Sequence, residues 1–111
     1  MTSSSKFEVR TEIPDTTTRP NGALARRQVS KILDDFDCVV VDLSGVVLTP
    51  SFADEFLGVL LVEIGEARFR KSIRIVNVAD RSRPLLQTVL HRRASKPNPV
   101  KSPHGLANAC G

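Results

Sequence analysis

Residues 39–56 read VVVDLSGVVLTPSFADEF, and the first part of this stretch decides the fold. The segment 38–43, CVVVDL, is almost continuously apolar and rich in β-branched side chains. Such a run is typical of a central parallel strand that is covered on both faces. Ser44 and Gly45 indicate a turn after this strand, and residues 46–48 would extend it briefly.

A helix is expected directly after this turn, beginning at Ser51. We expect the Ser51 hydroxyl to cap it by accepting the N–H of residue 54, while Asp54 reaches back to the N–H of Ser51. Gly65 marks its end. Spacings of three and four residues define one apolar stripe, made of Ala53, Phe56, Leu57, Leu60, Leu61 and Ile64. Three apolar residues fall outside the stripe and are expected at the surface: Phe52, Val59 and Val62.

The segments around this stretch alternate between strand and helix patterns. KFEVRTEI (6–13) and SIRIVNV (72–78) alternate apolar and polar residues as strands do. Residues 21–36 carry a helical apolar stripe, and a last helix begins at Asp80 or Ser82. The order β-α-β-α-β-α predicts an α/β fold with a parallel sheet.

Length and composition suit one globular domain. The chain has 111 residues, 41% of them hydrophobic, and a formal net charge of +4. We expect a flexible leader at 1–5, the domain at 6–94, and a disordered basic tail at 95–111 that is rich in Pro, Ser and Gly. No apolar run reaches the length of a membrane span and MTSSSKFEVR lacks a signal sequence, so a cytoplasmic location is expected.

A basic cluster precedes the last predicted strand. Its charge would suit nucleic acid or an acidic partner. The chain has no Trp or Tyr to stack on bases, which favours the interpretation of a solvated surface over nucleic-acid binding. The cluster consists of Arg68, Arg70, Lys71 and Arg74.

An enzyme acting through Asp42 is the main catalytic alternative. Asp42 and Gly45 fit the motif of haloacid-dehalogenase-type phosphatases, but Ser44 stands where that motif needs a second acid for proton transfer. No glycine-rich phosphate loop is present, and His91 and His104 lack acidic or Cys neighbours at ligand spacing. We therefore expect no cofactor and no metal.

Ser51 is the candidate for regulation. As a cap it is structural, but a phosphate on its hydroxyl would sit at the positive end of a helix dipole. Asp54 and Glu55 lie beside it, so the added negative charge would enlarge an acidic spot and repel a docked partner.

Four segments together resemble the small bacterial STAS-like family, which is related to sulphate-transporter and anti-sigma-factor-antagonist domains. They are VVVDLSGV (39–46), SFADEF (51–56), IRIVNV (73–78) and the preceding helix ALARRQVSKILDDFD (23–37). The resemblance covers roughly residues 6–93.

The resemblance implies a single STAS-like domain with a mainly parallel or mixed sheet of about four strands flanked by helices. It further implies no enzymatic activity and a protein partner, either a histidine-kinase-like ATPase or an anti-sigma-type regulator. In related antagonists a Ser at the start of the helix after the central strand is phosphorylated, and Ser51 matches that position. The expected partner-binding residues are Ser44, Gly45, Ser51, Phe52, Asp54 and Glu55.

Overall fold

A parallel sheet and the helices that connect its strands make up residues 3–94, the part of the chain that the computed structural model describes. Within these residues the sheet has three strands in the order β1-β2-β3: β1 (Ser4–Glu8), β2 (Cys38–Asp42) and β3 (Ile73–Val76). The helices are α1 (Val9–Glu12), α2 (Arg19–Asp35), α3 (Pro50–Ala53), the π-helical segment η1 (Asp54–Gly58), α4 (Val59–Ile64), α5 (Glu66–Ser72), the 3₁₀ turn η2 (Asp80–Ser82) and α6 (Arg83–Ala94).

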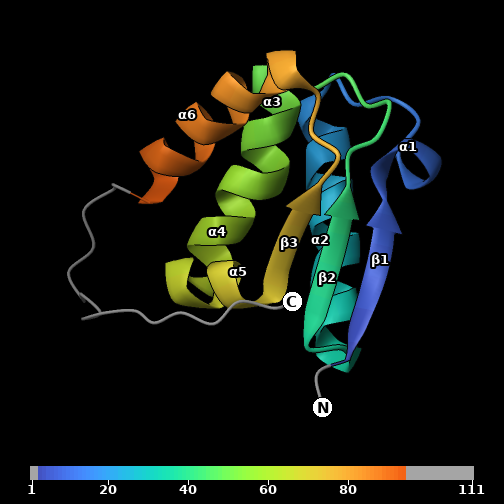
Figure 1. Ribbon diagram of the computed structural model, residues 1–111, viewed down its shortest axis with the longest axis vertical. Coiled ribbons are helices and arrows are strands. Elements are labelled where there is room, and N and C mark those ends of the chain that lie inside the picture. Colours follow the sequence, from blue (N-terminus) through green and yellow to red (C-terminus); the bar gives the residue numbers. More distant parts are fainter. Residues whose placement is uncertain (1–2, 95–111) are drawn as a thin grey trace.

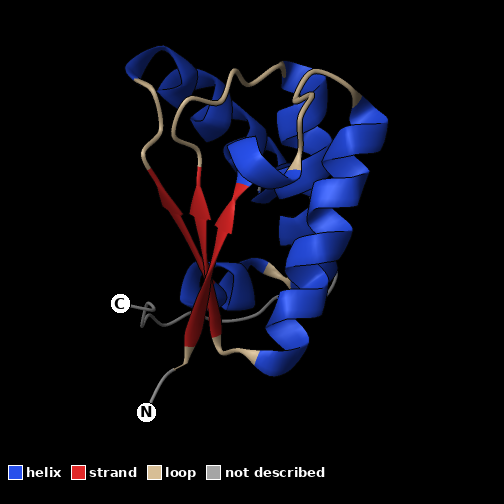
Figure 2. Cartoon of the chain, turned by 90° about the vertical axis from the view of Figure 1, so that its right-hand side faces the viewer, coloured by secondary structure: helices blue, strands red, loops and turns tan. Residues whose placement is uncertain are grey.

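The long helices of this part of the chain lie against one face of the sheet (Figures 1 and 2). Right-handed crossovers explain this, because strands added in the order β1-β2-β3 bring each connecting helix to the same side. On that side Phe7, Val41 and Ile75 are aligned in register. The expectation that helices cover β2 on both faces is therefore wrong for residues 3–94.

The opposite face of the sheet is more polar. Lys6, Val40 and Arg74 are aligned across the three strands in the alternate register, and both charged residues are exposed. The alternation of side chains along each strand separates the two faces, since successive residues point to opposite sides.

The core is built between the sheet and the helices. Phe7 of β1 meets Phe56 edge to face with ring centroids 6.3 Å apart, and Phe56 meets Phe52 in the same way at 5.7 Å. All three rings are buried. Aromatic pairs in this geometry stabilise a core by more than their buried area alone.

Several expectations are confirmed. The helix at 21–36 is present as α2, with Pro20 in its first turn and Thr18 capping it through the N–H of Asn21. The central strand is present as β2, and the C-cap at Gly65 has a φ of 90° that suits glycine. The strand expected at 72–78 is β3, and the last helix begins with η2.

Several expectations about strands are wrong. The sheet in the described chain has three strands, not four, and residues 46–48 form a loop whose Val46 and Leu48 are buried without strand pairing. Strand β1 begins at Ser4, so the residues from Ser4 on belong to the sheet rather than to a leader, and it ends at Glu8 where α1 begins. The expected tail at 95–111 lies outside the described residues.

Candidate functional site

The carboxyl ends of the three strands meet at one edge of the sheet, which we call the carboxyl edge. It comprises the loop 43–49, the start of α3, the segment 10–17 and the segment 77–82, which lie together at the top of Figure 1. Ligands and interaction surfaces of parallel sheets gather at this kind of edge. The side chains placed there are therefore the first candidates for function.

Asp42 is held by three neighbours at this edge. Its Oδ1 accepts hydrogen bonds from the Ser44 N–H at 2.9 Å and from Asn77 Nδ2 at 3.0 Å. Its Oδ2 lies 3.3 Å from the Lys6 ammonium. The hydrogen bond from Asn77, followed by that from Ser44, lowers the pKa of Asp42 despite its burial, and Lys6 acts in the same direction.

These contacts give Asp42 a structural role at this edge. It ties β1 to β3 through Lys6 and Asn77, and it fixes the turn through Ser44. Oδ1 accepts both hydrogen bonds, whereas Oδ2 faces only the exposed Lys6 ammonium. Asn77 adopts a φ of 58°, a left-handed conformation that Asn tolerates better than most residues.

The turn after β2 is exposed and open to other molecules. Ser44 and Gly45 are both exposed, and Gly45 has a φ of 69°. The Arg10 side chain lies across this glycine: a Cβ at Gly45 would come within 2.8 Å of Arg10 Nη1. Val47, two residues on, exposes 59% of its surface.

Thr49, not Ser51, caps the helix that follows. The Thr49 hydroxyl accepts the N–H of Phe52 at 3.3 Å, and Pro50 and Ser51 occupy the first two helical positions. The expected capping box of Ser51 and Asp54 is therefore wrong. Its physical reason is Pro50: proline is favoured at the first helical position, where its missing N–H costs nothing, and this places the cap at Thr49, two residues before Ser51.

Ser51 itself is partly buried. None of the hydrogen bonds that the structure shows within residues 3–94 uses its side chain, because Thr49 supplies the cap. The position is thus at a helix start on the carboxyl edge, as expected, although its expected structural role falls to a neighbour.

Phe52 is fully buried, so the expectation that it lies at the surface is wrong. The cause is η1, where the helix between α3 and α4 widens to π geometry. One extra residue in such a turn rotates everything after it by roughly 100° relative to a regular helix. The apolar residues after η1 consequently face the same side as Phe52, which joins the core against Phe56.

Asp54 and Glu55 form ion pairs with arginines of two other helices. Arg93 of α6 donates two hydrogen bonds to Asp54, at 2.9 and 2.7 Å. Arg26 of α2 donates to Glu55 at 2.9 Å, and Arg19 bridges both carboxylates at 3.3 and 3.2 Å. The Arg93 hydrogen bond lowers the pKa of Asp54, and the Arg26 hydrogen bond lowers that of Glu55.

This network corrects the picture of an acidic spot beside Ser51. Three guanidinium groups surround two carboxylates, so the local charge is not negative. The network joins α2 and α6 to the π segment, and its carboxylates are already occupied. Sequence reasoning missed its basic members because they come from helices far away along the chain.

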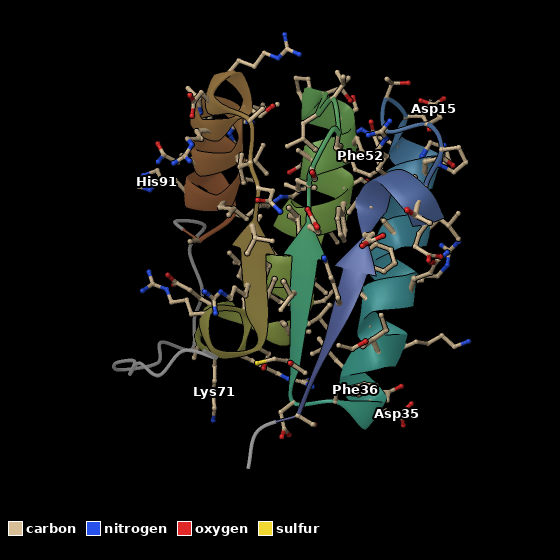
Figure 3. The ribbon with its side chains drawn as sticks, turned by 45° about the vertical axis from the view of Figure 1, so that its right-hand side comes forward. Asp15, Asp35, Phe36, Phe52, Lys71 and His91 are labelled. Carbon is tan, nitrogen blue, oxygen red and sulfur yellow. The ribbon has the colours of Figure 1, made fainter. Side chains whose placement is uncertain are left out.

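The basic cluster near β3 is at the surface. Arg68 and Lys71 of α5 and Arg74 of β3 are exposed and pair with no carboxylate in the part of the chain that is described; Figure 3 shows Lys71 extending away from the molecule. Arg70 differs, because it pairs with Glu66 at 3.0 Å.

Comparison with known proteins gives one match. A family model described as a STAS-like domain of unknown function, DUF4325, matches residues 21–83. This span runs from α2 to the start of α6 and includes β2, Ser51 and β3, so the resemblance expected from the sequence is confirmed. No curated protein and no solved structure matches the chain. Across residues 3–94, no helix combines the length and apolar character that crossing a membrane requires.

Proposed function

Because the chain belongs to the STAS-like domain family DUF4325, we propose that it is a non-enzymatic regulatory module that docks a protein at its carboxyl edge. The proposed partner is a histidine-kinase-like ATPase or an anti-sigma-type regulator, met in the cytoplasm. One observation carries the proposal: at the start of α3 Ser51 is partly exposed, and its hydroxyl makes no hydrogen bond within residues 3–94, because Thr49 caps the helix.

The contact surface in this proposal differs from the one expected from the sequence. Ser44, Gly45 and Ser51 remain in it because they are accessible at one edge. Phe52 is replaced by Val47, an exposed apolar side chain on the same loop. Asp54 and Glu55 act indirectly, by holding the helix in place through their arginines.

The proposed switch is phosphorylation of Ser51. A phosphate there would add up to two negative charges close to the positive end of the α3–α4 helix dipole. Arg19, which is half exposed and bridges the carboxylates one helical turn later, offers a nearby cation. The domain would keep its fold, while a partner that meets the edge with its own negative charge would be repelled.

The test begins with capture of the partner from the native host and measurement of its affinity for the purified domain. Ser51→Glu should weaken binding about tenfold, the effect of roughly 1.4 kcal/mol, with no change in the melting temperature. Ser30→Glu on α2 is the matched control, because it adds the same charge to a helix away from the edge. Equal affinity of the wild type and Ser51→Glu would remove Ser51 as the switch.

An Asp42-dependent phosphatase is the alternative enzyme. It predicts magnesium-dependent phosphate release that Asp42→Asn abolishes. Ser44, which stands where the phosphatase motif needs a second acid for proton transfer, argues against it. Turnover in the purified wild-type protein that is lost in Asp42→Asn would favour the enzyme over the docking module.

Nucleic-acid binding has one observation in its favour, the exposed cations Arg68, Lys71 and Arg74. It predicts an affinity that falls steeply with salt concentration, since each phosphate contact releases a counterion. Replacing all three by Ala should then abolish binding to duplex and single-stranded probes alike.

A further inference from the structure

A groove of about 340 Å³ lies on the carboxyl edge, between the segment 10–17 and the loop after β2. We propose that it binds an extended segment of a partner protein in which an Asp or Glu stands next to an aliphatic residue. The proposal rests on the docking function above and names the chemistry that docks. The groove is lined by Arg10, Ile13, Pro14, Asp15, Thr16, Thr17, Gly45, Val46 and Val47.

Hydrogen bonds hold the two walls of the groove together. The Thr16 hydroxyl donates to the Val47 carbonyl at 2.6 Å, and the Thr49 hydroxyl donates to the Thr16 carbonyl at 3.4 Å. These bonds join segments more than thirty residues apart in the chain. The groove is thus formed before anything binds, which reduces the conformational entropy that binding must overcome.

The apolar part of the groove has a buried base and an exposed rim. Ile13 and Val46 are buried, at 1% and 8% exposure, whereas Val47 exposes 59% of its surface. Val47 is one of three large apolar side chains that the described residues leave exposed; of the other two, Phe36 follows the end of α2 and Val62 lies on α4. An aliphatic side chain against Val47 and Pro14 would remove this surface from water.

Arg10 supplies the charge that the partner must match. It is exposed, and it pairs with no carboxylate anywhere in the described chain. Its guanidinium lies over Gly45, where the missing Cβ leaves room for it. A guanidinium presents a planar fork of donors that suits a carboxylate better than any other side chain does.

Asp15 is the acidic residue of the groove, and its carboxylate accepts hydrogen bonds within its own turn. Its Oδ1 accepts from the Thr17 N–H at 3.0 Å and from the Thr17 hydroxyl, and these bonds lower the pKa of Asp15. It lies on the loop after α1, at the upper right of Figure 3. Arg10 thus remains the charged group of the groove without a partner in the described residues.

The position of the groove also indicates whether phosphorylation of Ser51 would release or recruit the partner. Thr49 bonds to the groove wall through Thr16 and also caps the helix that begins with Pro50 and Ser51. The groove wall is therefore joined directly to the residue that precedes Pro50 and Ser51. A phosphate on Ser51 would repel an acidic segment in the groove, so phosphorylation would release the partner.

The test selects peptides from a random display library on the purified domain and measures their affinity by fluorescence anisotropy. Enriched peptides should carry Asp or Glu next to Leu, Ile or Val. Arg10→Glu should lower the affinity of the enriched peptides about tenfold or more, because a charged hydrogen bond is lost and repulsion is added. Arg27→Glu, an exposed arginine on α2, is the matched control and should have little effect, and circular dichroism should show that both variants are folded.

A charge reversal makes the test specific. Peptides with the acid replaced by Lys should lose affinity for the wild type and regain it on Arg10→Glu. The proposal is overturned if no peptide is enriched, if enriched peptides lack an acid, or if Arg10→Glu behaves like Arg27→Glu. In those cases a loss of partner binding in Ser51→Glu would still support the docking function. Failure of the groove proposal can thus be distinguished from failure of the docking function.

Discussion

Gly22 of α2 provides a sharp test of how the helix carrying Ser51 is held. A Cβ at this position would lie 2.9 Å from the Phe52 carbonyl oxygen, 2.9 Å from Glu55 Cβ and 3.3 Å from the Phe56 nitrogen. Distances below 3.0 Å are essentially never seen for real Cβ atoms. Two of these three neighbours are backbone atoms, which cannot rotate away.

Gly22→Ala therefore sets two effects against each other. Ala is favoured over Gly in a helix by about 1 kcal/mol. Overpacking a well-filled contact costs about 1–3 kcal/mol, and the upper part of that range applies because backbone must move. The expected result is a net loss of about 1–2 kcal/mol in the free energy of unfolding, or about 5–10 °C in melting temperature.

The measurement is urea unfolding followed by circular dichroism. Arg27 is exposed on the same helix, so Arg27→Gly compared with Arg27→Ala gives the propensity difference without any packing. If Gly22→Ala is more stable than the wild type by that same difference, α2 and η1 are not in the close contact that the structure shows, and the reasoning fails.

Two further predictions concern the helix that carries Ser51, at its start and in the π segment η1. Thr49→Val should destabilise the protein by about 1 kcal/mol, the usual loss for an N-cap, whereas Ser51→Ala should change the unfolding free energy by less than about 0.5 kcal/mol; the opposite order in thermal melts would restore Ser51 as the cap. Asp54→Asn should cost about 2 kcal/mol at pH 7, because Arg93 and Arg19 lose a charged partner. Since these arginines lower the pKa of Asp54 in the folded protein, its stabilising effect is fully present above the unfolded pKa of about 4 and is lost as pH falls through the lower folded pKa. Unfolding curves of wild type and Asp54→Asn should thus converge in strong acid, and a constant difference down to pH 2 would contradict the ion pair.

The order of strands and helices could be predicted because it depends on patterns local to each segment. The apolar run of β2, the stripe of α2 and the glycine after α4 all appear where the structure has them. The alternation in residues 6–13 wrongly predicted one strand over the whole segment, because Val9 and Ile13 are also four residues apart. Their spacing serves a helical turn equally well, and both are buried around α1.

The details of the candidate site could not be predicted from the spacing of apolar residues along the sequence. A regular helical wheel placed Phe52 at the surface, and only the π segment brings it into the core. The pairs of Arg19, Arg26 and Arg93 with Asp54 and Glu55 join residues more than 25 positions apart, so no local pattern signals them. The Thr49 cap, by contrast, had a local signal in the Thr-Pro pair at 49–50.

The most direct test of docking at the carboxyl edge is site-specific photo-crosslinking in the native host. Val47 on this edge and Val62 on α4 are similarly exposed, at 59% and 51%, so they form a matched pair for a photoreactive residue. We expect a discrete cross-linked protein from position 47 that is absent from position 62 and diminished by Ser51→Glu. A cross-link from position 62 alone, or a cross-link at 47 that Ser51→Glu leaves unchanged, would contradict a regulated docking edge.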